Sequence, residues 1–178
     1  MQSYQEGALR FDFPDAWMVR KLDGTSFFRK RFQSFAKPLD GKGSKSVDLV
    51  AFHPDVEDLW LIEVRDYRAE PRTKSSELFQ EIAEKIRDSL ACIHAMASIA
   101  GGEDQEFARR ALRQYRVRIV LHLEQSTKPS ALKPYVAEPA TFRQKLKQTL
   151  RAVDPHALAG GMQILNNQTP WSVTGITE

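Results

Sequence analysis

Two acidic residues and an arginine lie within two short apolar runs between Val47 and Arg68. Asp48 is in the first run, and Glu63 and Arg65 are in the second. A carboxylate buried without a partner is so costly that it takes up a proton or finds a cation, so these charges point to a site. Two carboxylates that converge at one end of a hairpin would form an oxygen-ligand site for a hard divalent ion such as magnesium.

The second run also predicts which side chains share a face. In a strand over 59–67, successive side chains point to opposite faces, so Glu63 and Arg65 are neighbours on one face. The segment 53–58 is rich in turn-forming residues and would fold the first run back antiparallel to the second. That hairpin would bring Asp48 close to Glu63. In the alternative interpretation, Glu63 and Arg65 only pair across the sheet surface.

The elements that position these residues follow from hydrophobic periodicity. Apolar residues recur at three- and four-residue steps over 75–100, which predicts a long helix that ends at Gly101. The later segments alternate between helical and strand patterns, namely a helix over 104–114, a central strand over 115–123, a helix over 139–152, and strands over 162–165 and 171–176. This order predicts an α/β fold with a mixed sheet flanked by helices.

The N-terminal region fits two patterns. Over 8–35, apolar residues alternate as in a strand and also recur as on a helix face, so we expect short strands or one short helix. A strand over 27–35 should follow. The segment 37–46 contains a proline, two glycines and two serines, which predicts a loop that leads into the strand carrying Asp48.

Length and composition limit the class of protein. A chain of 178 residues fits one domain, 1–178, with 42% hydrophobic and 28% charged residues as in ordinary globular proteins. The net charge of +3 permits an anionic partner without requiring one. A single cysteine, Cys92, excludes an intrachain disulfide and a cysteine-based zinc site. With no signal segment or membrane span in the sequence, we expect a cytoplasmic protein without membrane attachment.

The hairpin and the elements after it resemble a known family. An acid at the start of one strand, a turn, and Glu-x-Lys in the next strand, followed by a helix and a strand, are typical of the PD-(D/E)XK nuclease superfamily. Here the acid is Asp48, the tripeptide is Glu63-Val64-Arg65, and the resemblance covers a core of about residues 45–123. The runs GSKSVDLVAF and LWLIEVRDYR are also similar to small uncharacterised bacterial proteins of this type, which more usually have EVKDYR. The resemblance implies a restriction-endonuclease-like mixed sheet flanked by helices.

The resemblance also implies a metal site and a reaction. Asp48 and Glu63, with the Val64 carbonyl, would bind magnesium or manganese, and the metal would activate water and neutralise charge on a scissile phosphate. The third residue of the tripeptide is normally a lysine that positions or activates that water. Arg65 departs from this pattern, because a guanidinium stays protonated and can bind a phosphate but is a poor base.

A lysine elsewhere in the chain could replace the missing one. Lys85 lies on the long helix after the tripeptide, a helix that packs near the site in this fold, and is the leading candidate for a supplementary base. Lys21 and Lys45, which flank the sheet, are the other candidates.

The function expected from these residues is metal-dependent hydrolysis of nucleic-acid phosphodiester bonds, as in a magnesium-dependent endonuclease. The alternative is a catalytically degenerate protein of the same fold that binds nucleic acid or a protein partner without cleavage. A manganese ion between Asp48 and Glu63 would favour the first. A direct salt bridge from Arg65 to either acid would favour the second. Small proteins of this fold also work as homodimers or as subunits of larger assemblies.

Basic residues provide candidate contacts to nucleic acid. Lys21, Lys45 and Arg29 are the ones that we expect to bind phosphates. Three phenylalanines next to Arg29 could stack on bases, although such aromatic residues more often belong to the core. The basic clusters within 109–118 and 143–151 are either phosphate contacts or solvated faces.

Overall fold

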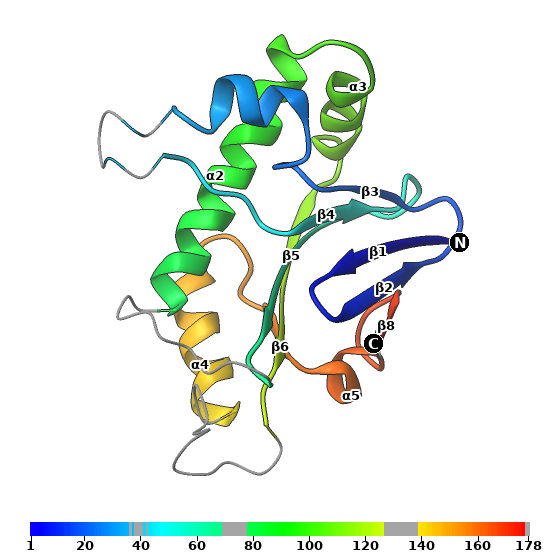
Figure 1. The fold of residues 1–178 in the computed structure, drawn as a ribbon, viewed down its shortest axis with the longest axis vertical. Helices are drawn as coiled ribbons and strands as arrows, with labels where there is room; N and C mark the ends of the chain where they lie inside the picture. The colour runs from blue at the N-terminus through cyan, green and yellow to red at the C-terminus, as the bar shows by residue number, and fades with distance from the viewer. Residues whose placement is uncertain (36, 38–40, 42, 69–77, 127–138, 177–178) are drawn as a thin grey trace.

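A five-stranded mixed sheet forms the centre of the protein (Figure 1). The computed structural model describes all residues except 36, 38–40, 42, 69–77, 127–138 and 177–178. In spatial order the strands are β3 (Met18–Arg20), β4 (Leu49–Phe52), β5 (Asp58–Asp66), β6 (Arg116–Glu124) and β7 (Leu158–Gly160). Strands β3, β4 and β5 pair antiparallel, whereas β5, β6 and β7 pair parallel. The predicted α/β class with a mixed sheet is confirmed.

The hairpin that carries the acidic residues is present as expected. Leu49 of β4 pairs with Ile62 of β5, so Asp48, one residue before β4, lies next to Glu63 across the hairpin. Strand β6 lies parallel to β5, with Leu121 opposite Glu63. Parallel neighbours need a long connection, and the helices between these strands provide it.

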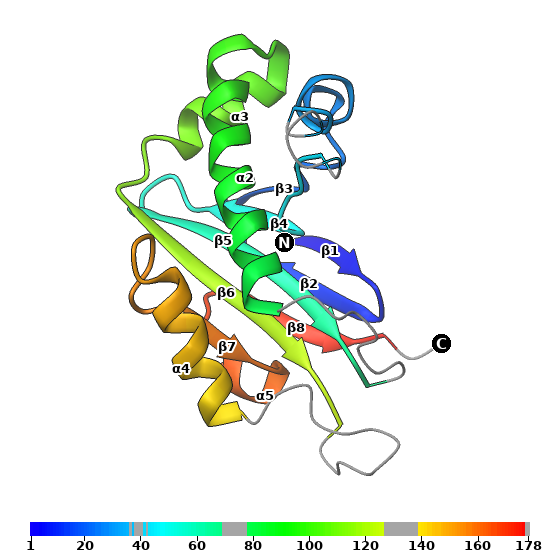
Figure 2. The ribbon, with the colours of Figure 1, turned by 90° about the vertical axis from the view of Figure 1, so that its left-hand side faces the viewer.

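Three helices pack against one face of this sheet (Figure 2). They are α2 (Leu78–Ile99), α3 (Gly102–Ala111) and α4 (Pro139–Leu150). The helices α2 and α4 lie within predicted helical segments, and α3 overlaps the predicted helix 104–114 but begins two residues before it. The first residues of the predicted long helix, 75–77, lie outside the described residues. The Phe79 and Phe142 rings, 4.9 Å apart, join the start of α2 to α4. Burial of Cys92 in α2 raises the pKa of its thiol to about 12, which suits an inert core residue.

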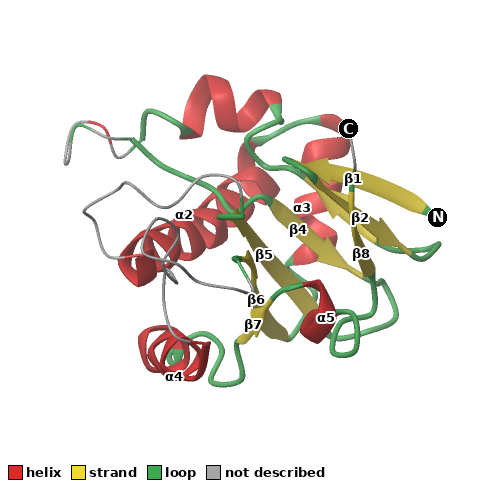
Figure 3. Ribbon diagram, turned by 60° about the horizontal axis from the view of Figure 1, so that its bottom comes forward, coloured by secondary structure: helices red, strands yellow, loops and turns green. Residues whose placement is uncertain are grey.

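A second sheet covers the opposite face (Figure 3). Strands β1 (Gln2–Glu6), β2 (Leu9–Phe13) and β8 (Ser172–Gly175) form an antiparallel sheet in the order β1-β2-β8. Trp171 is buried between the sheets, with its ring 5.1 Å from Trp60 and 5.2 Å from Phe13. Strand β8 falls within the predicted strand 171–176, but the sequence did not predict a separate sheet.

Two predicted strands are helical turns instead. The segment 27–35 contains the π-helix η1 (Phe28–Phe32), whose Phe28 and Phe32 side chains are buried side by side with ring centroids 5.9 Å apart. Thr25 begins this turn, because its Oγ1 accepts a hydrogen bond of 3.1 Å from the Phe28 amide.

The second correction concerns the segment 162–165, which forms the short helix α5 (Met162–Leu165). A four-residue apolar run cannot distinguish strand from helix by periodicity. The late strand next to it is β7, which ends at Gly160. The predicted loop over 37–46 lies partly outside the described residues. No helix in the described part of the chain is long and apolar enough to cross a membrane.

Candidate functional site

Asp48, Glu63 and Lys85 converge on the helix-covered face of the mixed sheet. The Lys85 ammonium, on α2, lies 2.8 and 3.0 Å from the two Glu63 carboxylate oxygens. The same nitrogen lies 3.5 Å from Asp48 Oδ1. The structure therefore places both predicted metal ligands around one cationic group, supplied by the helix that follows the tripeptide.

Arg65 also pairs with Glu63 in this cluster. Its Nη2 lies 2.6 Å from Glu63 Oε1, and its Nη1 donates a hydrogen bond of 3.2 Å to the Val64 carbonyl. The Arg65 side chain is 21% exposed, whereas the Glu63 side chain is completely buried. Arg65 is thus the most exposed of the four side chains, with Asp48 at 16% and Lys85 at 15%.

A backbone hydrogen bond fixes the orientation of Asp48. The Val64 amide donates to Asp48 Oδ2 at 2.7 Å, and the other oxygen, Oδ1, faces Lys85. The Asp48 carboxylate is thereby held by the middle residue of the tripeptide itself. Oδ2 thus accepts a hydrogen bond from the backbone, and Oδ1 faces the Lys85 ammonium that Asp48 shares with Glu63.

Glu63 has the most perturbed environment in the cluster. Burial raises the pKa of its carboxyl, and the neighbouring Asp48 charge raises it further, whereas Lys85 and Arg65 act in the opposite direction. The resulting pKa is about 7. A carboxyl poised near neutral pH, between a second acid and two cations, is typical of functional sites.

Two residues of α2 hold the segment that leads into Asp48. Asp88 Oδ2 accepts a hydrogen bond of 3.0 Å from the Lys45 amide, and Ser89 Oγ accepts one of 2.9 Å from the Val47 amide. These bonds tie Asp48 to the helix that carries Lys85. Asp88 and Ser89 were not among the predicted site residues, although two polar residues between apolar positions of a buried helix were the available signal.

The oxygen donors fit a hard divalent cation. The two carboxylates lie around the Lys85 ammonium, and the Val64 carbonyl accepts a hydrogen bond from Arg65. Mg²⁺ is commonly bound by one or two carboxylates, waters and a substrate phosphate. The described residues contain no group of three or more His, Cys, Asp or Glu side chains that could hold a metal, so a closed zinc-type site is not found among them. Carboxylate oxygens are the donor type that magnesium and manganese prefer, and in this structure they contact Lys85, Arg65 and the Val64 amide.

Comparison with known proteins gives one relative. The chain is 31% identical, over its whole length, to a cysteine–tRNA ligase from Neisseria meningitidis serogroup A. It spans 30% of the length of that relative. No family model matches the chain, and no solved structure matches it significantly.

The three predicted phosphate contacts lie in different parts of the molecule. Lys45 is nearest to the cluster, because its ammonium pairs at 3.2 Å with Glu84, the neighbour of Lys85 on α2. Lys21 instead pairs with Glu6 at the end of β1 and is not brought to the cluster. It is therefore a poor choice for the displaced lysine.

Arg29 also lies away from the cluster. It is exposed on η1, which lies towards the α3 end of α2 (Figures 1 and 2). The neighbouring Phe27, Phe28 and Phe32 are buried, so the core interpretation of these rings is confirmed and they cannot stack on bases.

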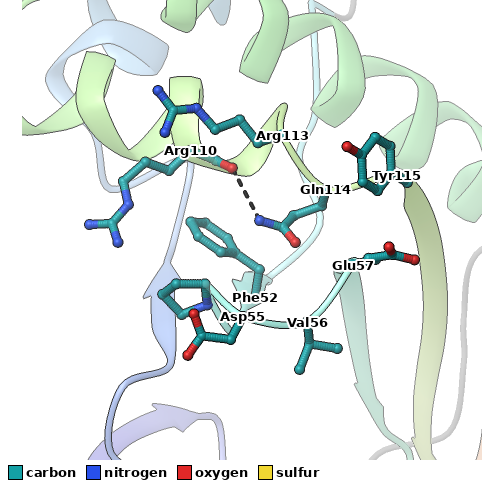
Figure 4. Close-up of a pocket in the computed structure, with 9 residues that line it drawn as sticks. Phe52, Asp55, Val56, Glu57, Arg110, Arg113, Gln114 and Tyr115 are labelled. Carbon is teal, nitrogen blue, oxygen red and sulfur yellow. Dashed lines mark hydrogen bonds between the residues drawn. The ribbon is translucent and has the colours of Figure 1, made fainter.

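The arginines within 109–118 contact their own chain. Arg116 pairs with Asp58 at 2.8 Å, and the Arg118 guanidinium lies 5.5 Å from the Trp60 ring centre. Other arginines of this segment line a pocket of about 250 Å³ at the start of β5, far along the strand from Glu63. Figure 4 shows Arg110 and Arg113 on one side of this pocket and the β4–β5 turn on the other.

Proposed function

We propose that the protein is a metal-dependent nuclease that hydrolyses nucleic-acid phosphodiester bonds, with Asp48 and Glu63 as metal ligands. The observation that carries this proposal is the convergence of both carboxylates on the Lys85 ammonium, at 2.8 and 3.0 Å from Glu63 and 3.5 Å from Asp48. The two acids supply oxygen donors of the kind that a metal for phosphodiester hydrolysis needs, and a lysine lies between them that could move beside such a metal.

Each side chain has a separate role in this proposal. Magnesium or manganese, held by Asp48, Glu63 and the Val64 carbonyl, would activate a water and neutralise charge that develops on the phosphate. Lys85 takes the role that the tripeptide lysine has in the superfamily, which is to orient the attacking water. Arg65, the most exposed of the four side chains, can bind two phosphate oxygens with its planar guanidinium.

RNA belongs among the substrates to be tested. The relative that aligns with the whole chain is named for a reaction on tRNA. Because that protein contains a segment similar to this chain, we propose RNA as well as DNA as a substrate of this chain. The homodimer and the larger assembly stay predictions.

A second function is favoured by one contact. The direct Arg65–Glu63 ion pair of 2.6 Å is the feature expected for a site that has become a structural ion cluster. In that case Asp48, Glu63, Arg65 and Lys85 balance one another's charge. The protein would then bind nucleic acid or a protein partner without cleavage.

A cleavage assay with matched variants separates the two functions. Plasmid DNA, single-stranded DNA and folded RNA are incubated with Mg²⁺ or Mn²⁺ and with EDTA. Metal-dependent cleavage by the wild type should fall by about 100-fold or more in Glu63→Gln and in Lys85→Ala. The exposed residues Glu106 and Lys145 provide the controls Glu106→Gln and Lys145→Ala, which should cleave as the wild type does.

Two results would reject the nuclease proposal. The first is that neither the wild type nor Arg65→Lys cleaves any of these substrates with either metal. The second is that Glu63→Gln and its control Glu106→Gln cleave equally well, since the activity would then come from elsewhere. In the first case, retention of a labelled oligonucleotide by the wild type would support the binding function.

A further inference from the structure

A second cavity, of about 560 Å³, lies where β6 and β7 end, between α4 and α5. Its walls come from the end of β6, from α4 and from the turn between β7 and α5, and include Leu123, Glu124, Phe142, Arg143, Gly161 and Met162. A cavity of this size, with mostly apolar walls and a few fixed polar groups, is typical of sites for small ligands or single nucleotides. None of these residues has a role in the proposed hydrolysis.

The fixed polar group of this cavity is the Glu124 carboxylate. Its Oε1 lies 2.9 Å from Nε2 of the buried His122 and accepts a hydrogen bond of 2.7 Å from the Met162 amide. Burial opposes ionisation of Glu124, but these hydrogen bonds lower the pKa of its carboxyl below the ordinary value. Within the described ranges no donor contacts Oε2, so a ligand can use this oxygen as an acceptor.

A glycine allows this carboxylate to lie so close to the backbone. A Cβ added at Gly161 would lie 2.9 Å from Glu124 Oε1 and 3.0 Å from Oε2. Any other residue at this position would push the carboxylate away from the place that His122 and the Met162 amide give it. The turn from β7 into α5 therefore cradles a charged acceptor.

Two arginines supply positive charge around the cavity. Arg68 is held by Asp66 through contacts of 2.6 and 2.9 Å, and Arg143 is exposed on α4. The cavity thus combines apolar walls, one anionic acceptor and cationic groups. A nucleotide has the matching parts, because its base is flat and carries hydrogen-bond donors, and its phosphate is anionic.

The cavity is next to the proposed active site. Leu123 and Glu124 pair in parallel register with Arg65 and Asp66, two to three residues beyond Glu63 along β5. Strand spacing and rise place the Cα of Leu123 about 8 Å from that of Glu63. Glu124 is on the face of β6 opposite Leu123, so a single strand would reach both places by passing around the ends of β5 and β6.

We infer that this cavity binds the base of a nucleotide next to the scissile phosphate, and that this base carries an exocyclic amino group. Glu124 Oε2 accepts a hydrogen bond from that amino group, as carboxylates do from cytosine. Arg143 contacts the phosphate of the same nucleotide. Adenine, cytosine and guanine have such an amino group, whereas uracil and thymine do not. This assignment rests on the proposed nuclease function for its substrate.

Titration with mononucleotides tests the cavity without cleavage. With ¹⁵N-labelled protein in EDTA, AMP and CMP should shift the Gly160 and Gly161 amide resonances to saturation. UMP should bind about tenfold more weakly, because it lacks the amino group. Arg143→Ala should weaken CMP binding about tenfold, and Lys145→Ala, on the same helix but outside the cavity, should not change it. Equal binding of CMP and UMP, equal effects of the two variants, or no shift at all would overturn the inference.

A variant that fills the cavity links it to cleavage. Ile164 lines the cavity from α5 and is 39% exposed, so Ile164→Trp can place a large ring there without a buried substitution. This variant should lose CMP binding, and an intact spectrum for the rest of the protein checks that it folds. If the wild type is active and prefers certain bases, an Ile164→Trp variant that keeps the same base preference overturns the inference alone. An inactive wild type that still prefers CMP to UMP rejects the nuclease proposal and keeps the cavity.

Discussion

The Lys85 ammonium makes two hydrogen bonds, of 2.8 and 3.0 Å, to the completely buried Glu63 carboxylate. Lys85 is itself only 15% exposed, so each of the two charges needs the other to compensate for its burial. Such a pair contributes little net stability compared with an apolar pair, but the loss of one partner leaves an uncompensated charge. The ion pair therefore makes the free energy of unfolding depend on whether Glu63 and Lys85 are charged.

Removal of the lysine charge should destabilise the fold in a pH-dependent way. We expect Lys85→Met to lower the free energy of unfolding by about 3 kcal/mol at pH 8, where Glu63 is ionised. The loss should be smaller at pH 5, because Glu63 then carries a proton. Urea unfolding at both pH values measures the difference, and Lys147→Met on the exposed face of α4 is the control. An equal loss at both pH values would contradict the burial of this charge pair.

The raised pKa of Glu63 predicts how stability changes with pH in the absence of metal. Between the ordinary pKa of 4.5 and the folded-state pKa of about 7, the folded protein keeps a proton that the unfolded chain releases. The contribution of Glu63 to stability is therefore full below pH 4.5 and is lost as the pH rises to 7. The total loss is on the order of 3 kcal/mol.

Comparison with Glu63→Gln isolates this contribution. The variant has no proton to release, so its free energy of unfolding should fall less than that of the wild type between pH 5 and pH 7. Chemical unfolding in EDTA at half-unit pH steps gives both curves. Parallel curves would show that the pKa of Glu63 is not raised in the folded protein.

Arg65 provides a prediction about substrate binding. Its side chain is more exposed than that of Glu63, so Arg65→Ala should mainly weaken phosphate binding and raise KM by about tenfold. Arg65→Lys keeps one positive charge and should retain more activity than Arg65→Ala. Steady-state cleavage kinetics separate KM from kcat. A large fall in kcat with unchanged KM would instead assign Arg65 to the chemical step.

The sequence predicted the parts of the fold that depend on local periodicity. Alternation in β5 and the turn after β4 predicted the hairpin, and register then placed Asp48 near Glu63. The three- and four-residue steps of α2 predicted the helix that carries Lys85. The choice of Lys85 itself came from the resemblance, since periodicity alone does not say which helical lysine faces a strand.

Other features depend on contacts that no local pattern encodes. The second sheet pairs Phe11 of β2 with Val173 of β8, two residues at opposite ends of the chain. The buried phenylalanines of η1 fit a strand as well as a helical turn until their packing is known. The cavity beside Glu124 was also missed, because three separate segments form it.

The hydrogen bond from the Val47 amide to Ser89 provides the last prediction. Ser89 is completely buried, so Ser89→Ala leaves a buried amide without its partner and should lower the free energy of unfolding by about 1–3 kcal/mol. Ser98→Ala is the matched control on α2, because Ser98 is exposed and its hydroxyl donates to the His94 carbonyl of the same helix. Because Val47 directly precedes Asp48, the buried variant should also weaken Mn²⁺ binding, whereas the control should not. Calorimetric titration with Mn²⁺ tests this, and unchanged affinity in a destabilised Ser89→Ala protein would show that Ser89 supports the fold without positioning Asp48.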